Sequence, residues 1–250
     1  MADPDPVLRL LWRHRLPSPD GAARRGPKQK VTVDDVVDAA IDIADRDGLG
    51  ALSMRGLAHH LGLGAMTLYT YVATRNDLLV LMVDQVFGRT VLPPHPDDLR
   101  ERLELVARLQ YEDCHAHPWL LEVTGVRAWL GPHVADRYEW QLGAVEGIGL
   151  DDIEMDQAVT LLASFGSAVA RAEQVVRHAE RESGMSDAEW WEANQEALGE
   201  VMAGRDYPLS GRVGTAAGEA YQAASDQRRE LDFGLARIVD GLIAHLPGGS

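Results

Sequence analysis

Hydrophobic residues recur at helical spacing from the first third of the chain onwards. Between Thr32 and Gly48 the apolar positions fall every three or four residues, at Val33, Val36, Val37, Ala40, Ile41 and Ala44. This pattern predicts one amphipathic helix. Thr32 and Asp35 have the spacing of a capping box at its start, and Gly48 suits its end.

Two short helices joined by a glycine turn are predicted next. Ser53 can cap the first helix, and Gly62 suits the left-handed position that ends it. The second helix, predicted from Ala65 to Tyr71, buries Leu68. It leaves a polar and aromatic face free, consisting of Met66, Thr67, Thr70 and Tyr71. A further helix starts at a second Thr-x-x-Asp cap at 74–77. This order is typical of a helix-turn-helix DNA reader.

The rest of the chain keeps helical periodicity and lacks the alternation typical of strands. From 153 to about 181, apolar residues repeat every seven positions, which makes a packing seam of Ala158, Leu162, Phe165, Val169, Ala172 and Val176. Small residues form an adjacent face that lets another helix come close: Val159, Ala163, Gly166 and Ala170. The closing helix, 231–246, is also apolar along one side. We expect a homodimer through the helices near 153–181 and 231–246, with a monomer core as the alternative.

Shorter helices are predicted at 97–115, at 118–129, from 132 onwards and at 188–201, the last within a polar segment, 182–215. A proline-rich boundary lies near 92–96. We therefore predict an all-α protein with an N-terminal extension (1–30, partly flexible), a three-helix helix-turn-helix DNA-binding domain (31–92) and a larger helical effector-binding and dimerisation domain (93–250).

Prolines break up the N-terminal extension, and a short amphipathic helix is predicted from Val7 to Leu16. It carries three arginines, Arg9, Arg13 and Arg15. Two interpretations stay open. The segment is either an arm that contacts DNA or a piece that docks apolar side chains on the body, namely Leu8, Leu11 and Trp12.

Charge is distributed unevenly along the chain. The net charge is −15, and residues 93–250 hold all of the excess, with 13 basic and 28 acidic side chains, whereas residues 24–92 hold 8 of each. Arg24, Arg25, Lys28 and Lys30 form a basic run without an acid. An acidic rear and a locally basic front would orient the molecule on DNA.

The same composition bears on compartment and chemistry. A single cysteine, the lack of a ~20-residue apolar run and the lack of a secretory-signal pattern at the start favour a cytoplasmic protein without a membrane partner. No phosphate-binding glycine loop or Gly-x-Ser-x-Gly turn is present, so we expect no enzyme and no cofactor. The alternative is a helical metal-binding protein or enzyme using Cys114, His115 and His117, although their spacing does not match a zinc site.

An ordered set of residues carries a family resemblance between Thr32 and about Phe87. It comprises Asp47-Gly48-Leu49, Ala51-Leu52-Ser53-Met54-Arg55, Leu57-Ala58, Leu61-Gly62-Leu63, Leu68-Tyr69-Thr70-Tyr71-Val72 and Arg75-Asn76-Asp77-Leu78-Leu79. With these residues the chain resembles the TetR family of bacterial transcriptional regulators. It departs from the family at Arg75, where lysine is usual, and at Ala73, where proline is frequent.

Further residues are similar to the branch that contains the tetracycline repressor. They are the Arg-Gly-Pro-Lys run at 25–28, the Thr-Leu-Tyr-x-x-Val form at 67–72 and, more loosely, His117-Pro118-Trp119, Gly131-Pro132 and Phe233-Gly234-Leu235. The resemblance implies a partner operator in double-stranded DNA, an inverted repeat, and a small-molecule effector. Members of this branch can take a metal with the drug, but no residue here specifies one.

The resemblance also implies the DNA-binding residues: Lys28, Lys30, Arg55, Met66, Thr67, Tyr69, Thr70, Tyr71 and Arg75. Arg55 is suited to a guanine edge, and Thr67, Tyr69 and Arg75 are suited to phosphate. Core packing remains the alternative for Met66, Tyr69 and Tyr71, and a solvated tail for the two lysines.

The effector candidates are the aromatic and polar residues of the predicted rear helices: Gln110, Tyr111, His115, Trp119, Trp129, Trp140, Gln141 and Phe165. Trp190 and Trp191 are expected near the site as a lid or as a contribution from the partner. The implied mechanism is a repressor released by its effector, which changes the spacing of the two recognition helices. An activator of the same fold is the alternative.

Overall fold

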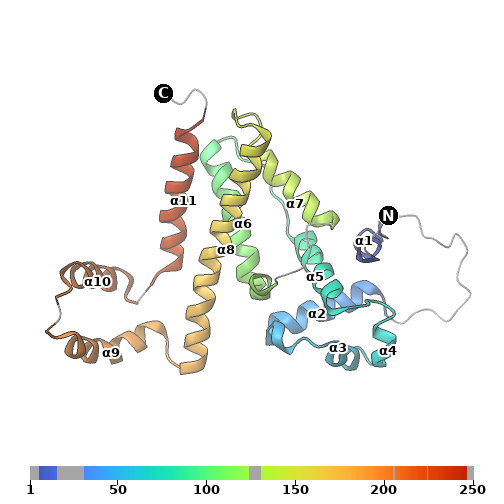
Figure 1. Cartoon of the computed structure of the whole chain (residues 1–250), viewed down its shortest axis with the longest axis horizontal. Coiled ribbons are helices and arrows are strands. Elements are labelled where there is room, and N and C mark those ends of the chain that lie inside the picture. The colour runs from blue at the N-terminus through green and yellow to red at the C-terminus, as the bar shows by residue number, and fades with distance from the viewer. Residues whose placement is uncertain (1–5, 16–30, 124–130, 205, 224, 247–250) are drawn as a thin grey trace, which may run out of the picture.

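The computed structural model describes residues 6–15, 31–123, 131–204, 206–223 and 225–246, and all secondary structure in them is helical. Figure 1 shows a helix-turn-helix unit on the right, a body of long helices in the centre and a separate helical pair on the left. The all-α prediction is confirmed.

The helix-turn-helix unit consists of α2 (Val33–Asp47), η1 (Leu49–Ala51), α3 (Met54–His60), α4 (Ala65–Leu68) and α5 (Arg75–Arg89). Both predicted capping boxes are present, Thr32 with Asp35 and Thr74 with Asp77. In each box the threonine hydroxyl accepts from the Asp backbone N–H, and the carboxylate accepts from the Thr backbone N–H. These local bonds fix where the two long helices of the unit begin.

The turn between α3 and α4 follows the sequence pattern, but α4 is shorter than predicted. Gly62 has φ 65°, the left-handed conformation that glycine adopts without steric cost. The predicted helix to Tyr71 ends at Leu68, since Thr70 and Tyr71 make i→i−3 backbone bonds of 3.0 and 2.9 Å. The Thr70 hydroxyl also donates to the Thr67 carbonyl at 2.7 Å. This side-chain bond competes with regular helix hydrogen bonding.

The body is built from α6 (Leu99–Ala116), η2 (Pro118–Glu122), α7 (Pro132–Gly143), α8 (Asp152–Ser183) and α11 (Gln227–Ala244). Gly166 lets α8 lie directly against α6, because a Cβ there would be 2.3 Å from the Ala107 carbonyl oxygen. The close helix approach predicted from the small-residue face of α8 is therefore confirmed. Gly234 plays the same part between α11 and α8, where Phe165 packs over it.

Two predictions for the rear helices need correction. The segment predicted as a helix over 118–129 has only the 3-10 turn η2 up to Glu122, and 124–130 lie outside the described residues. A helix that the sequence analysis missed, α10 (Pro208–Tyr221), follows α9 (Asp187–Met202). Glycines at 211, 214 and 218 lower the helix propensity of this segment, so its sequence pattern did not predict a helix.

The α9–α10 pair stands apart from the body in Figure 1. As described, neither helix has a buried residue. Several large apolar side chains along them are exposed, namely Trp190, Val201, Leu209 and Val213. Packing within one chain therefore contributes little to holding this pair in place.

The N-terminal helix α1 (Pro6–Leu11) docks on the helix-turn-helix unit. Val7 and Leu11 are buried in the same core as α2 and α5. The docking interpretation therefore describes α1, because Leu11 is buried and Trp12 packs against this core as predicted, whereas Val7 is buried in place of Leu8. The helix predicted from Val7 to Leu16 ends at Leu11, and Leu16 lies outside the described residues. The rest of the extension, including the basic run at 24–30, lies outside the described residues.

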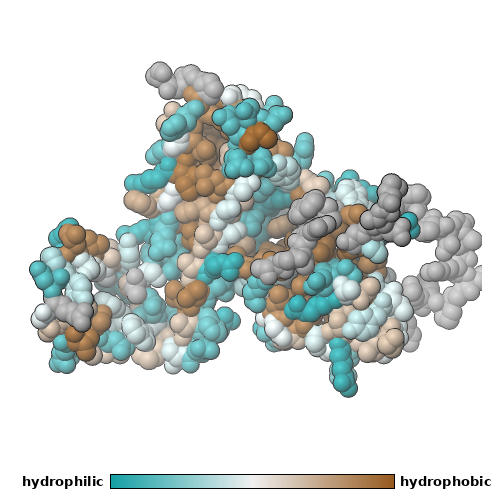
Figure 2. Space-filling view, in the orientation of Figure 1, coloured by the Kyte–Doolittle hydropathy of each residue, from teal (hydrophilic) through white to brown (hydrophobic). Residues whose placement is uncertain are grey.

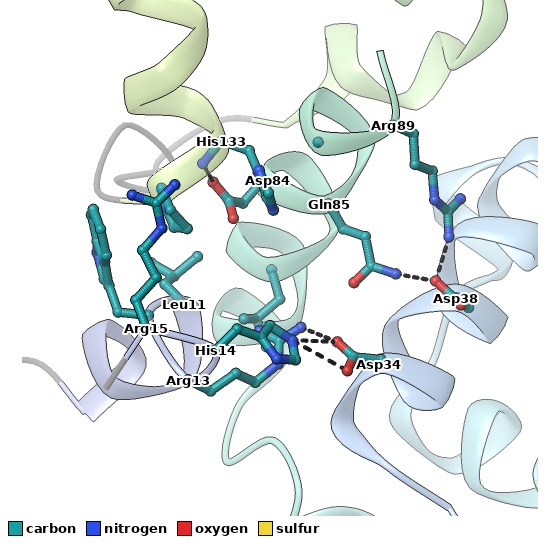
Figure 3. A pocket seen from close by; sticks show the side chains of 14 residues that line it. Leu11, Arg13, His14, Arg15, Asp34, Asp38, Asp84, Gln85, Arg89 and His133 are labelled. Atoms are coloured by element: carbon teal, nitrogen blue, oxygen red, sulfur yellow. Dashed lines mark hydrogen bonds and ion pairs between the residues drawn. The ribbon is translucent and has the colours of Figure 1, made fainter. Parts of the chain in front are cut away.

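Ion pairs hold the residues after α1 to both halves of the molecule. Arg13 and His14 point at Asp34 of α2 in Figure 3, and the Arg15 guanidinium lies 3.4 Å from the Asp136 carboxylate of α7. A cavity of about 290 Å³ lies between these residues and α5. The segment at 6–15 therefore bridges the DNA-binding unit and α7.

We expect Leu11→Ala to lower the free energy of unfolding by about 2–5 kcal/mol, because the side chain is 2% exposed and its loss leaves a cavity against α5. Urea unfolding of the purified chain measures this change. Leu209→Ala is the matched control, since Leu209 is 68% exposed and its loss should change stability by less than about 0.5 kcal/mol. Equal effects of the two substitutions would show that α1 is not docked in solution.

Candidate DNA-binding surface and effector cavity

The predicted DNA-reading residues of α3 and α4 share one exposed surface. Met66 is 80% exposed and Tyr69 44% exposed, and Arg55, Thr67 and Thr70 are exposed beside them. The buried side of the same unit holds Leu57, Leu68 and Val72. The core-packing alternative thus does not describe Met66 or Tyr69, whereas Tyr71 is half-buried and packs against the core.

Arg75, which is predicted to contact phosphate, also makes hydrogen bonds within the protein. Its guanidinium donates to the carbonyl oxygens of Leu49 (3.1 Å) and Leu52 (3.4 Å), which ties the start of α5 to η1. The residue is nevertheless exposed. Its contact with phosphate stays a prediction. Lys28 and Lys30 lie outside the described residues.

A cavity of about 970 Å³ lies in the body beside the last turn of α5. It is lined from α5 to α8 by Phe87, Gln110, Val134, Ala135, Arg137, Tyr138, Glu139, Gln141, Asp156, Ala163, Ser164, Ser167, Ala168 and Arg171. Gln110 and Gln141 are the predicted effector residues among them. Small side chains on α8 leave the space open, and a volume of this size accommodates a drug-sized molecule.

The most buried polar group of the cavity wall is Arg137, which is 3% exposed. Its guanidinium carbon lies 5.6 Å from the ring centre of Phe87 and 5.7 Å from that of Trp140. Nη2 is 2.8 Å from a carboxylate oxygen of Asp113. The other oxygen of Asp113 accepts from the Thr90 hydroxyl at 2.8 Å. Burial raises the pKa of Asp113 and lowers the pKa of Arg137, because each charge loses hydration.

Tyr111 and His115, both predicted effector residues, bind Glu173 instead of lining the cavity. The Tyr111 hydroxyl donates to the Glu173 carboxylate at 2.7 Å, and a His115 ring nitrogen lies 3.0 Å from it. Burial and the neighbouring carboxylate raise the pKa of Tyr111 to about 12. Arg177 completes the cluster at 2.8 Å from Glu173. These contacts join α6 to α8 and give both residues a structural role.

Three further predicted effector residues, Trp119, Trp140 and Phe165, also lie outside the cavity lining. Trp119 is 1% exposed, packs in the core of the DNA-binding unit, and donates from its ring nitrogen to Asp45 at 2.7 Å. The ring nitrogen of Trp140 donates to the Pro93 carbonyl at 2.7 Å, and its ring packs against the guanidinium of Arg137. Phe165 packs against Gly234 of α11, and Trp129 lies outside the described residues. The positions of Trp119, Trp140 and Phe165 give their effector assignment no support, and the assignment of Trp129 stays a prediction.

Apart from Gln141, sequence reasoning missed the wall that α7 contributes to the cavity. Val134, Arg137, Tyr138 and Gln141 recur at helical spacing and line the cavity together. The sequence did carry a signal for this wall, because polar residues occupy positions of α7 where an apolar core stripe is expected. Arg137 in particular sits at a core position of α7.

Another buried acid connects the two halves of the molecule. Asp84 of α5 accepts from the backbone N–H groups of His133 (2.9 Å) and Val134 (3.1 Å), so it caps the start of α7. Burial, the largest influence, raises the pKa of Asp84 despite these bonds. Its position within the apolar run of α5 marked it as unusual in the sequence.

The proposed metal-ligand residues have separate partners. Cys114 is buried with its sulfur 3.4 Å from the amide nitrogen of Gln110, and burial raises the pKa of its thiol. His115 pairs with Glu173, whereas His117 lies 2.8 Å from Asp45. In the parts of the chain that the structure describes, no three such side chains are grouped as metal ligands. The helices of those parts also include none with the length and apolarity of a membrane span.

An exposed helix-turn-helix followed by a helical body with a cavity beside the connecting helix defines a ligand-responsive DNA-binding regulator. Residues 92–246 match the family described as "Tetracyclin repressor-like, C-terminal domain". The chain belongs to this TetR family and is a DNA-binding transcriptional regulator.

Individual relatives agree with this assignment. The HTH-type transcriptional repressor DrrR1 of Streptomyces coeruleorubidus is 38% identical, with 94% of this chain and 84% of that protein covered. An HTH-type transcriptional regulator of Saccharopolyspora erythraea is 30% identical, with 87% and 86% covered. The structure of Streptomyces coelicolor ActR in complex with actinorhodin is 28% identical, has a TM-score of 0.67, and covers 86% of this chain and 98% of that one.

We expect Glu173→Gln to lower the free energy of unfolding by about 1–2 kcal/mol at pH 7, because a neutral amide accepts weaker bonds than a carboxylate. Burial alone would raise the pKa of Glu173, but the bonds from Tyr111 and His115 and the charge of Arg177 together lower it. A carboxyl with a lowered pKa contributes stability above the ordinary glutamate range and loses it as the pH falls through the lowered value. The difference between wild type and variant should therefore shrink in acid.

Urea unfolding between pH 7 and pH 4 measures this dependence. Glu182→Gln is the control, because Glu182 is exposed at the end of α8 and pairs only with His178 at 3.5 Å. A Glu173→Gln variant as stable as wild type at pH 7 would contradict the structural role given to this cluster.

Proposed function

We propose that this regulator is a homodimeric repressor that a small-molecule effector, bound in the 970 Å³ cavity, releases from its operator. One observation carries the proposal. The helix α5 begins beside the DNA-reading surface and ends at the cavity wall, where Phe87 lines the space. An effector that displaces this end of α5 therefore moves the helix-turn-helix at the other end. The protein acts in the cytoplasm and by binding rather than by catalysis.

The DNA-reading role falls to the exposed face of α3 and α4. Arg55 lies in the first turn of α3, where an extended guanidinium reaches a base edge of the major groove. Met66 offers an apolar contact for a thymine methyl, while Thr67, Tyr69 and Thr70 offer hydroxyls for phosphate. Two copies read successive major grooves only if their recognition helices are about 34–36 Å apart.

The dimer is proposed to form through α8 and α11. Each carries large exposed apolar side chains, namely Leu161 and Val175 on α8 and Phe233 on α11. Figure 2 shows apolar surface gathered along the upper part of these packed helices. Burying such surface between two copies gives the four-helix contact common in helical dimers. We expect sedimentation equilibrium to give a molar mass twice that of one chain.

The effector is proposed to be a small organic molecule with a ring system. ActR, which has the same fold and is 28% identical to this chain in sequence, binds actinorhodin. The cavity here combines the aromatic rings of Phe87 and Tyr138 with amide and hydroxyl groups. That mixture of apolar area and a few polar groups is typical of a ligand site.

We expect Arg55→Ala to weaken operator binding by about 1–3 kcal/mol, or roughly 5- to 150-fold in Kd, because a bidentate contact to guanine is lost. The operator duplex is first selected in vitro with the purified wild-type protein, and Kd is then measured by gel shift. Arg46→Ala is the control. Arg46 is exposed at the end of α2 and pairs with Asp47 at 2.8 Å. Unchanged Kd in Arg55→Ala would remove Arg55 from the reading surface.

We expect Ser164→Phe to keep operator affinity within about twofold of wild type while abolishing release by an effector. The added ring occupies the cavity, whereas the DNA-reading surface is untouched. His178→Phe is the control, because His178 is exposed further along α8 and away from the cavity lining. Gel shifts with and without an effector found by screening distinguish the two. Normal release from Ser164→Phe would show that the effector binds elsewhere.

A further inference from the structure

Arg137 is buried in the cavity wall with hydrogen-bonding capacity to spare. One guanidinium nitrogen, Nη2, lies beside Asp113 at 2.8 Å. Within the described residues, Nε, Nη1 and Nη2 all lack a hydrogen-bond acceptor in favourable geometry, so the contact of Nη2 with Asp113 is an ion pair only, and each nitrogen is shielded from solvent. A buried donor without a partner costs free energy, because it has lost its hydration and gained no hydrogen bond. An acceptor arriving in the cavity would recover this energy.

The charges around the cavity favour an acidic acceptor at this position. The carboxylate-bearing residues of the lining, Glu139 and Asp156, are exposed and half-buried respectively, whereas Arg137 is the deeply buried charge. The second lining arginine, Arg171, is exposed and already donates to the Leu121 carbonyl at 2.7 Å. The deeply buried charge of the wall is therefore the Arg137–Asp113 ion pair, whose arginine has donors to spare, while Glu139 and Asp156 lie toward solvent, where water screens them.

The rings that flank Arg137 suit a planar ligand. Phe87 and Trp140 hold the guanidinium between them at 5.6 and 5.7 Å, and Phe87 also faces the cavity. A flat ring system can pack on Phe87 while its acidic oxygen reaches Nε or Nη1. Arginine is well suited to this geometry because its donors lie in one plane.

The partner of Arg137 leads directly to the end of α5. Asp113 accepts from the Thr90 hydroxyl at 2.8 Å, and Thr90 is the C-cap residue of α5. An anion placed beside Arg137 competes with Asp113 for the same cation and repels its carboxylate at short range. The hydrogen bond that Asp113 accepts from the Thr90 hydroxyl changes as a result.

We propose that Arg137 recognises an acidic oxygen, a carboxylate or phenolate on an aromatic ring system, and that this contact acts through Asp113 on Thr90 at the end of α5. The inference rests on the proposed function, since it assigns the cavity to the effector. It adds the chemical class of the effector and a positioning residue, Thr90, that does not touch it.

The first experiment compares two probes that differ only in charge, anthraquinone-2-carboxylate and anthraquinone-2-carboxamide. Isothermal titration calorimetry measures their binding to the full chain at pH 7. We expect wild type to bind the acid at least about tenfold more tightly than the amide, and Arg137→Gln to bind both with the affinity of the amide. Equal affinities in wild type, no binding of the acid up to 1 mM, or an acid affinity unchanged in Arg137→Gln would each overturn the proposal.

Folding of the variants needs its own control, because removing Arg137 leaves Asp113 as an unpaired buried charge. The double variant Arg137→Gln/Asp113→Asn keeps a neutral hydrogen-bonding pair of similar size. It should fold and lose the preference for the acid. A double variant with wild-type preference for the acid would contradict the assignment.

The second experiment tests Thr90 by gel shift with the selected operator. Thr90→Val removes the hydroxyl but leaves the cavity lining intact, so the Kd of the carboxylate should stay within about twofold. The ratio of operator affinities with and without the probe should fall by about threefold or more. An unchanged ratio would remove Thr90 from the coupling.

The two experiments separate the inference from the proposed function. If acid and amide bind equally and both release the operator, the effector cavity stands and the role of Arg137 fails. If the acid binds through Arg137 but leaves operator affinity unchanged, recognition by Arg137 stands and release of the operator by occupation of this cavity fails.

Discussion

The helix α5 belongs to two packed units at once, and the arrangement of the molecule depends on that fact. Its early residues Leu78, Leu81 and Met82 are buried with α2 and α3, whereas Asp84 caps the start of α7. The contact is tight. A Cβ on Gly131 would lie 2.0 Å from the Asp84 carboxylate, so the chain can pass there only with glycine. Because two backbone N–H groups of α7 bind one carboxylate of α5, a shift of either helix must move the other or break buried hydrogen bonds.

Two further contacts restrict the same junction. Asp45 of α2 accepts from the ring nitrogen of Trp119 in η2, so the body is also anchored on the first helix of the DNA-binding unit. The segment after α1 pairs with α2 through Asp34 and with α7 through Asp136, and Figure 3 shows the pair of Arg13 with Asp34. With three links, the two units cannot rotate freely. A ligand signal is therefore expected to take the form of a small shift along α5 and α7 rather than a hinge opening.

Local rules explain how much of this fold could be predicted from the sequence. Capping boxes at Thr32 and Thr74, the glycine turn at Gly62 and the seven-residue repeat of α8 each depend on residues within one or two helical turns, and each has the predicted structure. The helix α10 was missed because its glycines weaken the local signal and no core face replaces it. Of the candidate effector residues, Gln110 and Gln141 line the cavity.

The remaining effector candidates failed to come together for a common reason. Trp119, Tyr111 and Phe165 are large and apolar enough to be useful in a core, and burial of such side chains is favourable wherever the fold has room for them. Sequence alone gives residue type and helical face but not which faces leave a gap between helices. The gap here arises because α8 presents Ala163, Ser164 and Ser167 toward the preceding helix α7, a pairing of faces that the pattern within either helix does not reveal.

Buried charge at the junction has an energetic cost that a purely structural role does not explain. Asp84, Asp113 and Arg137 are each less than a tenth exposed, and burial shifts the pKa of each toward its neutral form. Well-packed apolar residues at such positions would often stabilise a protein as much or more. Directional bonds differ from apolar contacts in one respect, because they tolerate little displacement before their energy is lost. A junction built from them has few acceptable arrangements, so a ligand that supplies a competing partner can shift it between discrete states with a modest binding energy.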